Sequence, residues 1–220
     1  MENPLWRSTP EGEKETARIE AFSDGVFSIA ITLLVLDIHV PTTDQADATG
    51  LLSQLLHLWP NMLAFVASFF FILVMWINHH RLFTLIRRSD NNLLLLNGLL
   101  LFGVILVPFP TALAAEYLQH RDEATAVMFY TGWFFVIAIF FNLLWRYAAH
   151  NNRLLTEKTD RQLAAALTRQ FSFGSPLYLA ALLVGLFSPL LSIVLSIALA
   201  VFFALPSKAI QRLTESGAKQ

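Results

Sequence analysis

Long apolar runs are the feature that most limits what this chain can fold into. A helix that spans a bilayer needs about 20 mainly apolar residues. Five runs approach or exceed that length: Ile19–Ile38, Trp59–Asn78, Leu93–Ala115, Ala124–Trp145 and Phe171–Leu205. Only 14% of the 220 residues are charged, whereas soluble domains carry about 25%. These charges are too few to cover the surface of a soluble fold, so we expect an all-α, polytopic integral membrane protein.

Two of the runs contain prolines that predict breaks. Phe171–Leu205 is too long for one straight helix, and Ser188-Pro189 near its middle predicts a tight hairpin. Its two arms would be Phe173–Phe187 and Pro189–Leu205. The third run holds Pro108 and Pro110, which predict a kink or an early helix end. The sequence therefore predicts six transmembrane helices in each subunit.

The distribution of basic residues orients these helices. In the six-helix arrangement, all but one of the 15 Lys and Arg residues fall on the same side, and the exception is Arg121. By the positive-inside rule, both termini are expected in the cytoplasm. The predicted divisions are a cytoplasmic segment 1–18, a membrane domain 19–205 with a cytoplasmic connector 146–170, and a cytoplasmic tail 206–220. Within the connector, apolar residues at helix-like spacing predict a helix over Leu154–Phe171. Met1–Arg18 is too polar to be a cleavable signal peptide.

Several functional classes are disfavoured by composition and motifs. The absence of Cys rules out disulfides and thiol chemistry. A net charge of -1 argues against nucleic acid as a partner, since phosphate binding needs a basic field. No dinucleotide, phosphate-loop, nucleophile-elbow or zinc-protease motif occurs. The chain is therefore not expected to be an enzyme or to hold an organic cofactor.

The first apolar run carries unusual chemistry. An ionised carboxylate in hydrocarbon is costly unless it is paired or hydrated, so Asp24 is a functional candidate. Arg18 lies six residues earlier and could approach this Asp24 or that of a neighbouring subunit. One side of the helix would carry a stripe that Ser28 borders: Gly25, Ile29, Thr32, Leu33 and Leu36. Taken alone, the stripe favours ordinary helix packing over a pore, because small and hydroxyl residues are common where membrane helices meet.

A second polar cluster follows the second run, where Trp76, Asn78, His79 and His80 reach the same depth as Asp24. A His or Asn here could hydrogen-bond Ser23 or Asp24 and hold the base of the first helix. Equally, Trp and His could form an interfacial belt at the headgroups. Neighbouring His residues on a helix diverge by about 100 degrees, so a metal site is not expected.

Two segments resemble the prokaryotic branch of the transmembrane protein 175 family of potassium channels. They are the run Arg18-x-x-x-Phe22-Ser23-Asp24 with Ala30–Leu36, and the segment Trp76-x-Asn78-His79-His80-x-Leu82-Phe83. The resemblance covers the transmembrane region. It implies a homotetramer, surrounded by lipid, with one pore on its four-fold axis lined by the first helix of each subunit. The permeant ion would be K⁺, weakly to moderately preferred over Na⁺.

The resemblance also implies site residues. The pore constriction would comprise Ile29, Thr32, Leu33 and Leu36. A structural polar network would comprise Arg18, Ser23, Asp24 and Trp76 with His79 or His80. Gly25 departs from the family pattern, where alanine is expected after the aspartate. Asp37, at the outer end of the first helix, could concentrate cations at the mouth, although an ordinary surface carboxylate is the stronger reading.

Physically, a narrow apolar ring expels water, so an ion meets a hydration barrier there. K⁺ gives up hydration water more cheaply than Na⁺, and a hydroxyl ring at Thr32 could replace part of the lost shell. Two other functions stay open. One is a proton or proton-coupled cation transporter that uses Asp24 and His80. The other is a scaffolding membrane protein without flux. In the channel reading, the expected location is a plasma membrane, in particular a bacterial inner membrane.

Overall fold

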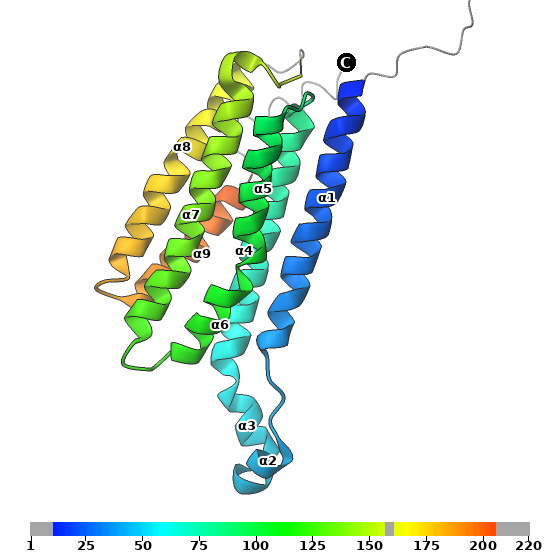
Figure 1. Cartoon of the computed structure of the whole chain (residues 1–220). Helices are drawn as coiled ribbons and strands as arrows, with labels where there is room; N and C mark the ends of the chain where they lie inside the picture. Colours follow the sequence, from blue (N-terminus) through cyan, green and yellow to red (C-terminus); the bar gives the residue numbers. More distant parts are fainter. Residues whose placement is uncertain (1–10, 157–160, 206–220) are drawn as a thin grey trace, which may run out of the picture.

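The structure is a computed structural model that describes residues 11–156 and 161–205. These residues form an elongated helical bundle, in which the long helices run back and forth between two ends (Figure 1). We call the end where α1 begins and α4 and α7 finish the basic end, since Arg18, Arg87 and Arg153 lie there. Residues 1–10 of the expected segment 1–18, residues 157–160 of the expected connector 146–170, and the whole expected tail 206–220 lie outside the described residues.

The helices follow one another along the chain with short connections. Their bounds are α1 Glu11–Leu33, the 3-10 turn η1 Leu34–Asp37, α2 Thr43–Thr49, α3 Leu51–His57, α4 Trp59–Leu85, α5 Asn91–Ile105, α6 Pro108–Tyr117, α7 Glu123–Ala149, the 3-10 turn η2 His150–Asn152, α8 Arg161–Val184 and α9 Pro189–Ala204. Helices α2 and α3 form an extension at the end opposite the basic end (Figure 1). The expected all-α class is confirmed for the described residues.

Four helical segments are long and apolar enough to cross a membrane among the residues that the structure describes. They are Thr16–Asp37, Trp59–Leu85, Asn91–Tyr117 and Glu123–Asn152. Helix α9 is apolar but shorter, and α8 has 24 residues with Pro176 inside it. The chain is thus a multi-pass membrane protein, of which these four spans meet the length and composition required for crossing.

Both breaks expected at prolines are confirmed. The third apolar run stops being one helix at Leu106 and Val107, and α6 starts with Pro108 in its first turn, where the missing N–H costs nothing. The last run turns before Pro189. There the Ser188 hydroxyl accepts a hydrogen bond from the Leu191 N–H at 3.3 Å and caps α9.

Two expected boundaries are wrong. The second run does not end at Asn78, because α4 continues to Leu85 and carries His79 and His80 inside the helix. The connector helix expected over Leu154–Phe171 is also not separate: among the described residues of that range, the helical part belongs to α8. Leu155 instead forms an isolated antiparallel bridge with Ile86, and α8 runs unbroken from Arg161 to Val184. The connector joins the following helix because buried Leu167 and Phe171 extend its packing face.

The core lies around α7, which packs against α5, α6, α8 and α9. Phe134 of α7 stacks on Phe71 of α4 with ring centroids 4.1 Å apart, and Tyr130 meets Phe134 edge-on at 4.9 Å. Nearer the basic end, Trp145 is fully buried and donates from Nε1 to the Thr168 hydroxyl at 2.9 Å. The aromatic side chains of α7 therefore link α4 to α8 within the bundle.

Helix α1 lies at one edge of the bundle and contacts only α4 and α5 among the long helices. Its packing face is narrow and consists of residues spaced three or four apart: Thr16, Ile19, Ser23, Phe27, Ala30 and Leu34. This spacing is that of one helix side. Much of the rest of its circumference stays exposed when only the described residues are considered.

Candidate functional site

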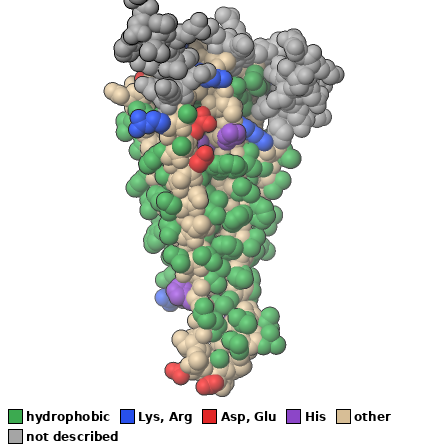
Figure 2. Space-filling view, turned by 90° about the vertical axis from the view of Figure 1, so that its right-hand side faces the viewer, with side chains coloured by type: hydrophobic (Ala, Val, Ile, Leu, Met, Phe, Trp, Pro, Cys, Tyr) green, Lys and Arg blue, Asp and Glu red, His purple; other side chains and the backbone are tan. Residues whose placement is uncertain are grey.

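The uncovered side of α1 holds the stripe that the sequence singled out. Ile29 is 53% exposed and Leu36 is 68% exposed, and Leu33 is also exposed. The Thr32 hydroxyl donates to the Ile29 carbonyl at 2.9 Å, a bond within its own helix. Figure 2 shows this side of the molecule, where hydrophobic side chains cover most of the length and charged groups gather toward the basic end. These side chains are thus only partly used to pack α1 onto the described part of its own subunit.

The packed side of α1 carries a buried chain of hydrogen bonds. Ser23 donates to the Ile19 carbonyl at 2.8 Å, and the Asn97 amide donates to the Ser23 hydroxyl at 3.0 Å. Asn97 Oδ1 lies 2.9 Å from His79 Nε2. Ser23, Asn97 and His79 belong to α1, α5 and α4, and all three are buried. The chain therefore joins three helices through groups that would be costly to leave unpaired.

Aromatic contacts hold the His79 ring in that chain. The ring stacks on Phe83, with centroids 4.4 Å apart, and meets Phe27 of α1 at 5.4 Å. With a fixed ring orientation, Nε2 stays directed at Asn97. His79, rather than His80, is thus the histidine that connects to Ser23.

Asn97 was missed by the sequence reasoning. It is a single amide inside the apolar run of the third span, between Leu93 and Leu101. An uncharged polar side chain in that position should itself have been flagged, because it needs a partner inside the membrane. The signal that could have identified Asn97 is its position well inside an apolar run.

Asp24 lies on the open edge of α1 and has a different partner. Trp76 Nε1 of α4 donates to Asp24 Oδ1 at 2.8 Å, and the Trp76 ring stacks on His80 at 6.1 Å. Asp24 is exposed within the single subunit. The expected polar network is thus divided into a buried part around Ser23 and His79 and an open part around Asp24, Trp76 and His80.

Arg18 does not join either part. Within the described residues it makes no ion pair, and it lines a groove between α1 and α5 together with Phe22 and Leu94. The groove measures about 760 Å³. Arg18 and Asp24 therefore stay apart in the single subunit, contrary to the contact that their six-residue spacing allowed.

Asp37 ends η1 at the opposite end of the helix. Its backbone carbonyl accepts from Asn61 Nδ2 at 3.5 Å and from the His39 ring at 3.1 Å. One carboxylate oxygen of Asp37 is buried without a hydrogen-bond partner in the part of the chain that the structure describes. The side chain is only partly exposed, so it is not a freely solvated surface carboxylate in the single subunit.

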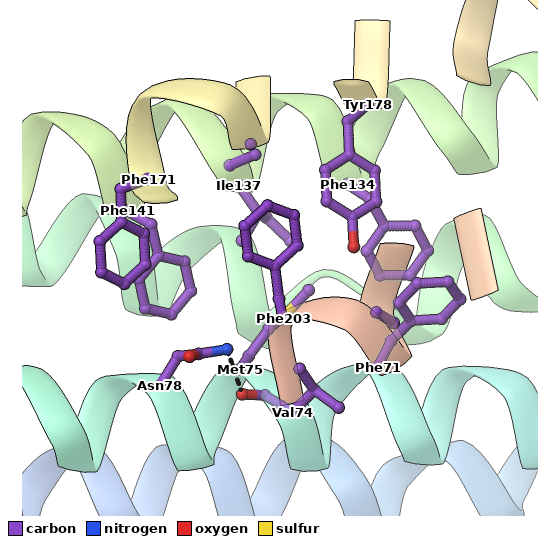
Figure 3. Close-up of a pocket in the computed structure, with 13 residues that line it drawn as sticks. Phe71, Val74, Met75, Asn78, Phe134, Ile137, Phe141, Phe171, Tyr178 and Phe203 are labelled. Atoms are coloured by element: carbon purple, nitrogen blue, oxygen red, sulfur yellow. Dashed lines mark hydrogen bonds between the residues drawn. The ribbon is translucent and has the colours of Figure 1, made fainter. Parts of the chain in front are cut away.

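A second cavity lies away from α1, among α4, α7, α8 and α9. It measures about 60 Å³ and is walled mainly by aromatic rings, including Phe71, Phe134 and Phe203 (Figure 3). The Asn78 amide at its edge donates to the Val74 carbonyl at 3.0 Å. The cavity offers no charged group. Across residues 11–156 and 161–205, no three His, Cys, Asp or Glu side chains come close enough to hold a metal ion.

Comparison with known proteins gives a consistent result. The family profile described as the endosomal/lysosomal potassium channel TMEM175 matches residues 18–108. A potassium channel of Chamaesiphon minutus is 53% identical over 197 residues, which cover 90% of this chain and 97% of that protein. The match therefore extends over nearly the full length of both proteins.

Two further matches are a solved structure and a relative that is named a proton channel. The crystal structure of a lysosomal potassium-selective channel TMEM175 homolog from the same organism superposes with a TM-score of 0.81. It is 51% identical, and the match covers 89% of this chain and 99% of that one. The endosomal/lysosomal proton channel TMEM175 of Bos taurus is 36% identical over 135 residues, which are 58% of this chain and 28% of that protein.

Proposed function

The chain belongs to the TMEM175 family, and from that premise we propose that it is a potassium-permeable channel in which four copies surround one pore. The proposal draws on the relative of Chamaesiphon minutus, which is named a potassium channel and matches almost end to end. The proposed location is a bacterial inner membrane, with lipid around the assembly and K⁺ as the permeant ion.

The proposed topology has six spans, with both ends of the chain in the cytoplasm. It is supported by the basic residues, all but one of which fall on one side in this arrangement. It is also supported by the hydrogen bond from Arg81 to the Ala204 carbonyl at 2.8 Å, which joins the last part of α4 to the last residue of α9. Helices α8 and α9 would cross as the shortest pair, with the bilayer thinned or the helices partly shielded by neighbours.

The single observation that carries the proposal is the division of α1 into two faces. Its buried face uses Ser23, Phe27 and Ala30, while Ile29, Leu33 and, in the following turn η1, Leu36 stay partly or largely exposed. In a four-fold assembly, this uncovered stripe would line the axis. Thr32 would add a ring of hydroxyl groups between the aliphatic rings.

The proposed mechanism follows from the size and polarity of those side chains. Where the rings come together, the conduit is too narrow and apolar to keep water, so an ion loses hydration there. K⁺ sheds water at lower cost than Na⁺, and the Thr32 hydroxyls offer oxygen atoms at the same depth. Widening the rings would readmit water and reduce the penalty for both ions.

The test is a conductance measurement on purified protein in planar bilayers. Ile29→Ala and Leu33→Ala are expected to raise single-channel conductance or to lower the K⁺-over-Na⁺ permeability ratio. Val35→Ala is the matched control, because Val35 in the adjoining turn η1 is as exposed as Ile29 but lies off the stripe. If both stripe variants conduct and select like the parent, or if Val35→Ala changes conduction as much, the aliphatic rings do not form the constriction.

A second candidate is proton permeation. Asp24, Trp76 and His80 form a polar edge at the basic end, and the Bos taurus relative is named a proton channel. A pH gradient applied without K⁺ to protein in vesicles would drive acidification of an internal dye. Loss of that flux in both Asp24→Asn and His80→Gln would favour this reading, and unchanged flux would exclude these two groups as the relay.

A further inference from the structure

A groove between α5 and α7 opens on the outside of the subunit at the basic end. It measures about 360 Å³. Its lining residues are Leu96, Leu143, Arg146, Tyr147, His150 and Arg153. The span that contains most of them, Glu123–Asn152, finishes here, so the groove lies where the membrane meets water.

The lining changes from apolar to basic along the axis of α7. Leu143 and Leu96 are placed toward the middle of their spans, whereas His150 and Arg153 follow the last turn of α7. Leu143 and Arg146 are exposed. A ligand in the groove would therefore meet hydrocarbon-like walls at one end and cationic donors at the other.

The basic groups exceed the acidic ones at the mouth of the groove. Arg146 donates from Nη2 to the Ser172 hydroxyl at 3.0 Å, a neutral acceptor, and it has no carboxylate partner within the described residues. The nearby carboxylate, Asp90, is already engaged. Its Oδ1 accepts from the Leu93 N–H at 2.9 Å, and its Oδ2 accepts from Tyr147 at 2.7 Å and Arg153 at 2.8 Å.

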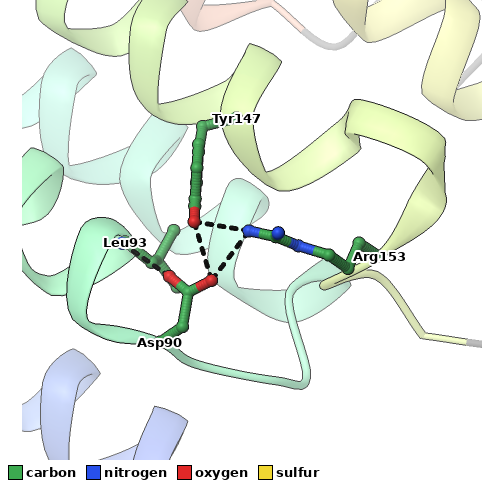
Figure 4. A network of polar contacts seen from close by, with 4 residues as sticks. All are labelled: Asp90, Leu93, Tyr147 and Arg153. Atoms are coloured by element: carbon green, nitrogen blue, oxygen red, sulfur yellow. Dashed lines mark hydrogen bonds and ion pairs between the residues drawn. The ribbon is translucent and has the colours of Figure 1, made fainter.

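The polar wall of the groove is held in place before any ligand arrives. Figure 4 shows Asp90, Tyr147 and Arg153 joined in one network, with Arg153 also bonded to the Tyr147 hydroxyl. The Arg87 N–H donates to the Leu154 carbonyl at 2.9 Å, which joins the segment after α7 to the segment after α4. A preorganised cation needs little reordering when it binds.

From this geometry we propose that the groove binds an anionic phospholipid. The phosphodiester accepts hydrogen bonds from Arg146, with His150 and Arg153 beside it, because guanidinium groups match phosphate oxygens well. The first part of an acyl chain lies against Leu143 and Leu96. Basic pockets between transmembrane helices at this depth suit acidic headgroups. The site is separate from α1 and does not depend on the proposed pore.

The first experiment compares lipids that differ only in headgroup. The full-length purified protein in detergent is titrated with phosphatidylglycerol or with phosphatidylcholine of the same acyl chains, and retained lipid is counted by native mass spectrometry. Phosphatidylglycerol is expected to be retained preferentially. Arg146→Gln is expected to weaken its retention about five-fold, the effect of one cation near a membrane surface. Arg121→Gln, with a side chain 86% exposed at the opposite end, is the matched control and should retain it normally.

A second pair of variants fills the groove without changing its charge. Leu143→Trp places a large ring in the groove and should reduce phosphatidylglycerol retention. Leu95→Trp is the matched control, because Leu95 is 65% exposed on α5 and does not line the groove. Equal retention of the two lipids by the parent protein would overturn the proposal. Normal retention by both Arg146→Gln and Leu143→Trp would overturn it as well.

Two alternative occupants are separated by the same measurements. If inorganic phosphate alone displaces the lipid, the groove is a phosphate site and the lipid proposal fails. If Leu143→Trp breaks the oligomer and lipid retention is lost only in step with that dissociation, the groove is a contact between subunits. Loss of phosphatidylglycerol from an intact oligomer supports the lipid site.

Discussion

Helices α1 and α7 are similarly apolar, but they differ in how much of their surface is buried within the subunit. Their most apolar windows have mean hydropathies of 1.8 and 2.0, yet 22% of the first window is buried within the subunit against 39% of the second. α7 packs against four helices, while α1 packs against two. The difference indicates that α7 supplies cohesion within the subunit. Most of the surface of α1 is not buried by the described residues of the subunit.

The largest effect expected from this comparison is on stability. Phe134→Ala on α7 removes a fully buried ring stacked on Phe71, and a loss of about 3–5 kcal/mol of unfolding free energy is expected. Leu36→Ala in η1, the turn that continues α1, removes a side chain with little packing inside the subunit, so monomer stability should change by less than about 0.5 kcal/mol. Denaturant unfolding of monomers in detergent measures both. Equal losses would erase the distinction between the two helices.

The next effect concerns the buried hydrogen bonds that join α1 to α5 and α4. Asn97→Ala removes the amide between Ser23 and His79 and leaves both groups buried. Ser23 keeps its bond to the Ile19 carbonyl, so a loss of about 1–3 kcal/mol is expected from leaving His79 Nε2 buried and unpaired. Asn92→Ala, exposed in the first turn of the same helix, is the control and should be nearly neutral. If Asn97→Ala is as mild, α1 is held by apolar packing alone.

The smallest effect concerns Asp90, in the loop that connects α4 to α5 at the basic end, close to the C-terminal end of α7. Partial burial raises the pKa of Asp90, but the bonds from the Leu93 N–H, the Tyr147 hydroxyl and Arg153 outweigh this effect and hold the pKa below its ordinary 3.8. The stability from this lowered pKa is therefore present above the unfolded value and is lost as the pH falls through the folded value.

Asp90→Asn keeps a good helix cap and removes only the charge. Because Asp90 and Arg153 are partly exposed, a loss of less than about 1 kcal/mol at neutral pH is expected. The difference from the parent should shrink as the pH drops below 3.8. Thermal melts across a pH series measure it. A difference that stays constant down to pH 2 would assign the effect to the cap geometry instead of the charge.

Much of the fold could be anticipated from particular residues. Pro108 and Ser188-Pro189 mark real breaks, because a residue without an N–H is favoured in the first turn of a new helix. Asp90 stands directly before the third apolar run, and its side chain caps α5 by accepting from the Leu93 N–H. The extension of α4 to Leu85 was not visible, since polar His79 and His80 look like a helix end until the buried partners of His79 are known.

The candidate site was anticipated in part. The sequence selected Ser23, Asp24, Trp76 and His79, and the structure brings Ser23 near His79 and Asp24 onto Trp76. It could not show that Asn97 of a third helix joins the first pair, or that Arg18 faces a groove next to α5. Those contacts depend on how α1, α4 and α5 rotate against one another, and periodicity within one helix carries no information on rotation between helices.

By itself, the sequence determined three properties: the protein is embedded in a membrane, its helices break at particular prolines, and certain residues of the first helix share a side. These properties follow from local physics: the cost of polar groups in hydrocarbon, the missing N–H of proline and the 3.6-residue turn. Only the tertiary structure decided which side of α1 is used for packing and how the polar groups pair. Burial and hydrogen bonding are properties of surfaces in contact, and these form only when segments distant in the chain come together.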